Sequence, residues 1–144
     1  MIENDTVKLL RECDAGIKMG ISSIEEVVDY VKSEKLKSCL NESKSEHKKL
    51  DIELENMLES YKDDGKEPSA IAKGMSWMKT NVKLGMNKSD STVADLITDG
   101  CNMGVKSLNK YLNQYEAASE RSKDITKKLI NLEEKLLYDV RGFL

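Results

Sequence analysis

A single proline, Pro68, interrupts a chain of 144 residues. Proline lacks a backbone N–H and its ring clashes with the preceding helical turn, so its scarcity leaves room for long helices. On both sides of Pro68, apolar residues recur at spacings of three and four, which places them on one helical face. No stretch alternates apolar and polar residues between turn signals as a strand does. The chain is therefore predicted to be all-α.

Two long helices are predicted before the proline, over about residues 6–32 and 34–63. Asn4 or Asp5 can cap the first, because their side chains accept hydrogen bonds from free N–H groups. The link around Ser33 is so short that the two helices should pack antiparallel. Their predicted inner faces are Leu10, Cys13, Ile17, Ile21, Ile24, Val28 and Val31, then Leu36, Leu40, Ser43, His47, Leu50, Leu54, Met57 or Leu58, and Tyr61.

The clearest break in the chain covers residues 63–68. Gly65 can adopt a positive φ at a helix end, and Pro68 suits the first turn of a new helix. A short helix is predicted next, at about 69–84. Its apolar side would contain Ile71, Met75, Trp77, Met78, Val82 and Leu84.

Two more long helices are predicted over about 91–116 and 119–141, capped by Asp90 or Ser91 and by Ser119. Two tight hairpins with about 28 residues between them indicate a ferritin-like four-helix bundle with one long crossover that contains the short helix. In that topology the second helix and the helix after the crossover run in the same direction. One domain, residues 1–144, is expected.

Glycines occur in two pairs inside the predicted helices, Gly16 with Gly20 and Gly100 with Gly104. An interior glycine costs a helix about 1 kcal/mol relative to alanine, so four of them invite a compensating role. Close approach between helices is one such role, with Gly20 near Gly104. The alternative is that some of them only loosen the helices. A capping-box pattern just after Gly20 marks a weak point, but the apolar stripe continues in phase, so one helix is predicted there.

Four segments resemble the bacterial ferritin-like DUF2383 family of four-helix bundles: residues 65–69, 74–79, 99–108 and, more weakly, 14–17. The resemblance rests on the order and spacing of these segments and extends over about residues 9–140. It implies the ferritin-like fold. The family's function is poorly defined, so no activity follows from the resemblance.

A ferritin-like di-iron site uses a Glu from each of two helices and a Glu-x-x-His from each of the other two. Here Lys18 stands where the resembling pattern has a Glu, and Lys44 stands three residues before His47. His47, Glu134 and Cys101 remain as candidate metal ligands, and we interpret them as a vestigial site. No cofactor is expected, and iron or manganese bound through altered ligands is the alternative. The simpler interpretation of His47 is a buried, hydrogen-bonded imidazole.

Charge and cysteine content exclude further classes. The net charge is −3 with acids and bases interleaved, which is typical of a solvated helix face and predicts no nucleic-acid binding. No apolar run approaches the ~20 residues that cross a bilayer, and no secretion signal is recognised. Three cysteines without a CxxC pair indicate reduced thiols and a cytoplasmic location. The single histidine leaves no catalytic triad to assemble.

Three functions are compatible with these patterns. The first is a non-enzymatic protein-interaction or stress-related structural role, as a homo-oligomer and preferably a dimer, with an interface around Trp77. The second is a metalloprotein with altered ligands. The third is small-molecule binding in the bundle interior beside the four glycines.

Overall fold

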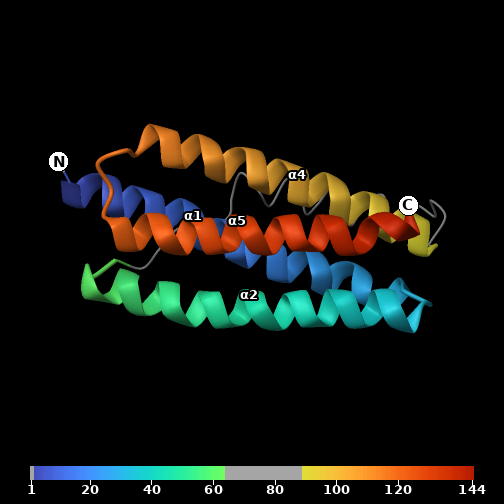
Figure 1. Cartoon of the computed structure of the whole chain (residues 1–144). Coiled ribbons are helices and arrows are strands. Elements are labelled where there is room, and N and C mark those ends of the chain that lie inside the picture. The colour runs from blue at the N-terminus through green and yellow to red at the C-terminus, as the bar shows by residue number, and fades with distance from the viewer. Residues whose placement is uncertain (1, 64–88) are drawn as a thin grey trace.

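The computed structural model describes residues 2–63 and 89–144, with side chains from residue 5 onward, and shows four long helices packed side by side (Figure 1). The all-α prediction is confirmed for these residues, among which no strand occurs. The helix predicted at 69–84 lies outside them. The elements are α1 (Ile2–Val27), the 3-10 turn η1 (Val28–Tyr30), α2 (Glu34–Ser60), α4 (Asp90–Gln114), α5 (Glu120–Val140) and the 3-10 turn η2 (Arg141–Phe143).

Serine side chains begin three of these helices. Ser33, Ser89 and Ser119 each accept a hydrogen bond of 3.2 Å from the backbone N–H three residues later. Such a cap stabilises a helix by about 1 kcal/mol relative to alanine. The prediction for Ser119 is confirmed. The prediction of Asp90 or Ser91 is wrong, because the cap is Ser89.

Asp90 instead joins the starts of two helices. Its carboxylate accepts hydrogen bonds from the backbone N–H groups of Lys32 and Ser33, at 2.8 and 3.0 Å. The beginnings of α2 and α4 therefore lie at the same end of the bundle, and the two helices run in the same direction (Figure 1). This is the relative direction that the hairpin spacing predicted.

The opposite end is joined in a similar way. Asp5 accepts a hydrogen bond from Ala117 N, and Thr6 Oγ1 accepts one from Ser119 N at 2.8 Å. The starts of α1 and α5 are thereby held together. The predicted cap at Asn4 or Asp5 is wrong, because α1 already begins at Ile2 and the Asp5 carboxylate bonds the loop before α5.

The buried side chains form two apolar clusters separated along the bundle. One cluster packs Ile24, Val27, Leu36, Leu40, Val93, Ile97, Leu136 and Val140, and the other packs Leu10, Ile17, Leu54, Leu58, Leu108, Ile125 and Leu129. Most of the predicted inner faces are confirmed, except that Tyr61 is 38% exposed. Helix α1 passes Gly20 without a break, as predicted. Residues 41–49 of α2 and 131–135 of α5 fall between the members of the two clusters.

None of the described helices combines the length and the hydropathy needed to cross a bilayer.

Candidate functional site

A buried polar pair occupies the layer between the two apolar clusters. His47, in the middle of α2, is fully buried, and its Nε2 lies 3.0 Å from Oε1 of Glu133 on α5. Its Nδ1 lies 2.8 Å from the backbone oxygen of Ser43, one turn earlier in α2. Glu133 is itself buried, so both members of the pair are removed from water.

The contacts determine where the protons of this pair reside. A carbonyl oxygen only accepts, so Nδ1 must carry a hydrogen and donate it to Ser43. A second proton then lies between Nε2 and Oε1, because two lone pairs at 3.0 Å would repel. Wherever that proton resides, the pair has no net charge. A buried pair of this kind is tolerated only when both partners are present.

Three effects determine the pKa of His47. Burial is the largest and disfavours the imidazolium form, but the hydrogen bond and charge of Glu133 and the Ser43 carbonyl together outweigh it. The pKa of His47 is therefore raised above 6.5. The contact with Glu133 thus favours the protonated form of His47 despite its burial.

Gly20 on α1 makes room for the imidazole. A Cβ added at Gly20 would lie 2.6 Å from His47 Nε2, 2.7 Å from its Cδ2 and 3.4 Å from Glu133 Oε1. Gly104 on α4 faces the same carboxylate, because its added Cβ would lie 3.8 Å from Glu133 Cδ. Gly20 and Gly104, which the sequence predicted to lie near each other, therefore both face Glu133 from different helices.

A pocket of about 280 Å³ lies between α1 and α4 against this pair. All four helical glycines line it, and His47, Glu133 and Leu136 contribute from the two remaining helices. Its apolar lining comes from Met19, Ile24, Leu96, Ile97, Met103 and Leu108. Concave apolar sites with a few convergent polar groups are the usual form of ligand pockets.

Cys101 also lines this pocket, and its chemistry limits what it can do there. Burial, the negative charge of Glu133 and a hydrogen bond to Glu133 all raise the pKa of the thiol. The thiolate is the form that attacks electrophiles and binds metals. Cys101 is therefore held as a neutral thiol and is a poor nucleophile and a poor metal ligand in this setting.

The structure separates the three predicted ligands. His47 and Cys101 both lie beside Glu133, but Glu134 is on the exposed face of α5. The inward-facing carboxylate is thus one residue earlier than predicted. A signal for it exists in the sequence, because Glu133 follows Leu129 by four residues and precedes Leu136 by three.

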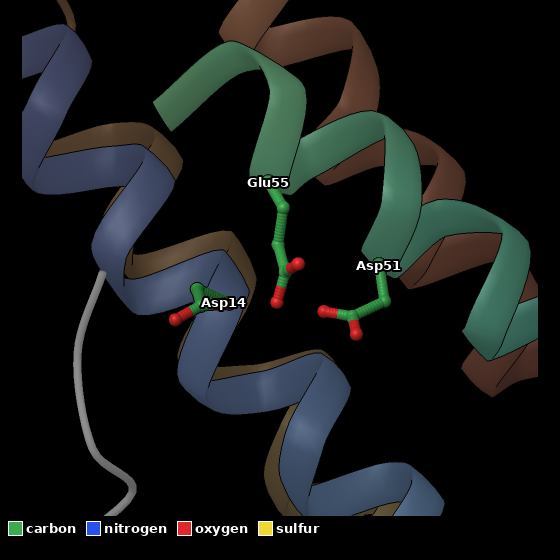
Figure 2. Close-up of side chains that lie close together, drawn as sticks. All are labelled: Asp14, Asp51 and Glu55. Carbon is green, nitrogen blue, oxygen red and sulfur yellow. The ribbon is translucent and has the colours of Figure 1, made fainter. Parts of the chain in front are cut away.

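A second cluster of polar side chains lies between α1 and α2, where Asp14, Asp51 and Glu55 come together (Figure 2). One oxygen atom from each lies within 4.8 Å of the others, and this is the one group of three potential metal-ligating residues found in the described part of the chain. These oxygens could hold a cation. Lys18 already supplies a positive charge there, since its Nζ lies 2.9 and 2.8 Å from the two Asp14 oxygens.

Asp51 has a buried carboxylate oxygen in that cluster. Its Oδ1 is buried and has no hydrogen-bond partner among the residues described. Burial, followed by repulsion from Glu55 and Asp14, raises the pKa of Asp51, and Lys18 offsets part of this effect. The cluster thus has a carboxyl group that is protonated more easily than an ordinary surface aspartate.

Comparisons of the chain with protein-family models, with curated proteins and with solved structures found no match. The resemblance to the ferritin-like DUF2383 family therefore stays a prediction.

Proposed function

We propose that this protein binds a small molecule in the pocket between α1 and α4. The observation that carries the proposal is a space of about 280 Å³ set against the buried His47–Glu133 pair. An engineered apolar cavity of ~150 Å³ holds a benzene molecule, so this pocket has room for about two fused rings. Small-molecule binding in the bundle interior was one of the three functions compatible with the sequence.

Three of the four glycines that line the pocket support this proposal, because close packing explains the absence of a side chain only at Gly20. Gly20 is needed for the imidazole, but an added Cβ would make only ordinary contacts at Gly16 and Gly104. At Gly100 it would meet no described atom within 4 Å. Each of these three glycines costs its helix about 1 kcal/mol relative to alanine without a packing reason. Keeping the pocket open is a role that compensates for this cost.

A cavity-filling variant tests the proposal. Gly100→Leu places a side chain in the pocket. Gly142→Leu, in η2, is the control: Gly142 does not line the pocket, and a Cβ added there would meet no described atom within 4 Å. We would measure binding of the two-ring probe 2-naphthol by calorimetry and by the thermal shift that a ligand of the native state produces. The wild type and Gly142→Leu should bind, and Gly100→Leu should not. Equal binding by Gly100→Leu would refute the proposal, as would a wild type that binds neither 2-naphthol nor its hydrocarbon parent naphthalene.

The metalloprotein alternative has weaker support from the site. Both ring nitrogens of His47 are engaged, the Cys101 thiol is held protonated, and Glu134 faces outward. An iron or manganese site on these three residues would need His47 to give up both hydrogen bonds. Metal analysis of protein purified without chelator, with His47→Ala as control, tests it: metal above the control level would favour this alternative.

The remaining sequence predictions concern relationships and partners. Membership of the DUF2383 family, the ferritin-like crossover, the cytoplasmic location and the absence of nucleic-acid binding stay predictions. The protein-interaction role and the homodimer stay predictions too, and the interface expected for them, around Trp77, lies outside the described ranges. Sedimentation at high concentration tests the dimer, and a strict monomer would contradict it.

A further inference from the structure

We infer that the pocket selects an apolar molecule that carries a neutral or cationic hydrogen-bond donor, such as an aromatic alcohol or amine, and rejects carboxylates. This inference rests on the proposed small-molecule function and adds the chemical class of the ligand. It follows from which hydrogen-bonding groups the pocket wall has left to offer.

His47 has no hydrogen-bonding capacity left for a ligand. Its Nδ1–H is donated to the Ser43 carbonyl, and its Nε2 shares a proton with Glu133 Oε1. Both ring nitrogens are therefore occupied. The pair as a whole has no net charge, so it does not attract an anion.

Glu133 supplies acceptor capacity. A carboxyl group can accept hydrogen bonds at both of its oxygens, and the imidazole contacts only Oε1. Cys101 donates only the weak hydrogen bond of a thiol to the same group. The absence of a side chain at Gly104 leaves Glu133 uncovered on the α4 side, since an added Cβ there would lie 4.0 Å from Oε2. A ligand O–H or N–H can therefore be accepted at this carboxylate.

The described lining of the pocket offers an anionic ligand no unpaired cation. It contains neither a lysine nor an arginine, and its one imidazole is already bonded to Glu133. Ser23, Ser107 and Tyr111 add hydroxyl groups but no charge. A ligand carboxylate would lose its hydration and gain no unpaired cation in return, which is unfavourable in an apolar site. An acid is thus the wrong partner even when its hydrocarbon part fits.

Three probes with the same two-ring body separate these possibilities: 2-naphthol, naphthalene and 2-naphthoate. At about pH 7 the first is neutral with a donor, the second has no polar group, and the third is an anion. We expect 2-naphthol to bind at least about tenfold more tightly than naphthalene, because its O–H bonds a buried carboxylate. We expect 2-naphthoate to bind at least about tenfold more weakly than naphthalene. A pocket without an acceptor would prefer naphthalene to 2-naphthol, because the phenol O–H would lose water without replacement.

The Glu133→Gln variant tests the residue assigned to this selectivity. It keeps the side-chain size and removes the charge, so the preference for 2-naphthol over naphthalene should narrow and the rejection of 2-naphthoate should weaken. Glu134→Gln makes the same change on the adjacent exposed side chain. It should leave the affinities of 2-naphthol and 2-naphthoate relative to naphthalene as they are in the wild type.

The outcomes separate the two proposals. If none of the three probes binds the wild type, the small-molecule function and the inferred ligand class both fail. If the probes bind but naphthalene or 2-naphthoate equals or exceeds 2-naphthol, the pocket stands and only the ligand class is refuted. Unchanged ratios in Glu133→Gln would also overturn the assignment of Glu133.

Discussion

Replacing Gly20 with alanine tests whether the His47–Glu133 layer is built as described. The added methyl carbon would lie 2.6 Å from His47 Nε2 and 2.7 Å from Cδ2, closer than carbon atoms approach one another in proteins. The imidazole cannot rotate away freely, because it is fully buried and bonded through both ring nitrogens. The ring or helix α1 must therefore move by several tenths of an ångström or more.

The expected magnitude follows from three contributions. Alanine gains about 1 kcal/mol over glycine in the interior of a helix. Straining or breaking the charged hydrogen bond to Glu133 costs about 1.5–3 kcal/mol, and the Ser43 bond costs about 1 kcal/mol. The free energy of unfolding should therefore fall by about 1.5–3 kcal/mol, which for a chain of this size lowers Tm by roughly 5–10 °C.

Gly16→Ala is the matched control, one turn earlier in the same helix. Its added Cβ would lie 3.5 Å from Leu129 Cδ2, an ordinary contact, so alanine should be neutral or should stabilise by up to about 1 kcal/mol. Urea denaturation followed by circular dichroism at 222 nm measures both variants. In a His47→Ala background the clash is removed, so Gly20→Ala should lose its cost. The reasoning is refuted if Gly20→Ala is as stable as Gly16→Ala, or if its cost persists without the imidazole.

Three further predictions concern ionisation, thiol accessibility and capping. The pKa of His47, measured by NMR, should lie above 6.5, because Glu133 outweighs the effect of burial. Because protonation of His47 is favoured in the native state, it stabilises the fold fully below about pH 6.5, and this contribution is lost as the pH rises through the native pKa. The urea midpoint of the wild type should therefore fall over that pH interval. A wild-type midpoint that falls no more than that of His47→Gln would contradict this. Cys39 is half-buried, whereas Cys13 and Cys101 are buried and have raised pKa values. One thiol should therefore react quickly with an aromatic disulfide reagent in the native protein, and all three should react in urea. Fast reaction of all three thiols in the native protein would be inconsistent with this packing. Ser89→Ala should cost about 1 kcal/mol of stability and Ser91→Ala should cost little, because Ser89 caps α4; equal costs would show that the cap is elsewhere.

Periodicity was sufficient to predict the helices and their directions. The stripe of spacings three and four gave the inner face of α2 through Leu36, Leu40 and His47, all of which are buried. Short links predicted antiparallel hairpins, and the long connection predicted that α2 and α4 run in the same direction. These features depend on the local spacing of apolar residues and on the lengths of the links between helices, and both can be read from a single sequence.

The details of the site depend on packing that periodicity does not resolve. Ser89 and Asp90 are both good helix caps, and only the position of Lys32 and Ser33 explains why Asp90 bonds another helix instead. Glu133 and Glu134 are adjacent acids, and a rotation of about 100° along α5 decides which one is buried. The pocket depends on distances between α1 and α4, which no spacing within either helix specifies.

The single histidine allows one measurement that addresses the proposed pocket directly. A long-range proton–nitrogen NMR spectrum contains the ring of His47 alone, and it can be recorded with and without saturating 2-naphthol. We expect the signals of its ring nitrogens to shift on addition of 2-naphthol in the wild type and in Gly142→Leu but not in Gly100→Leu. Ring signals that stay unchanged at saturating 2-naphthol in the wild type would contradict a binding site beside His47 and Glu133.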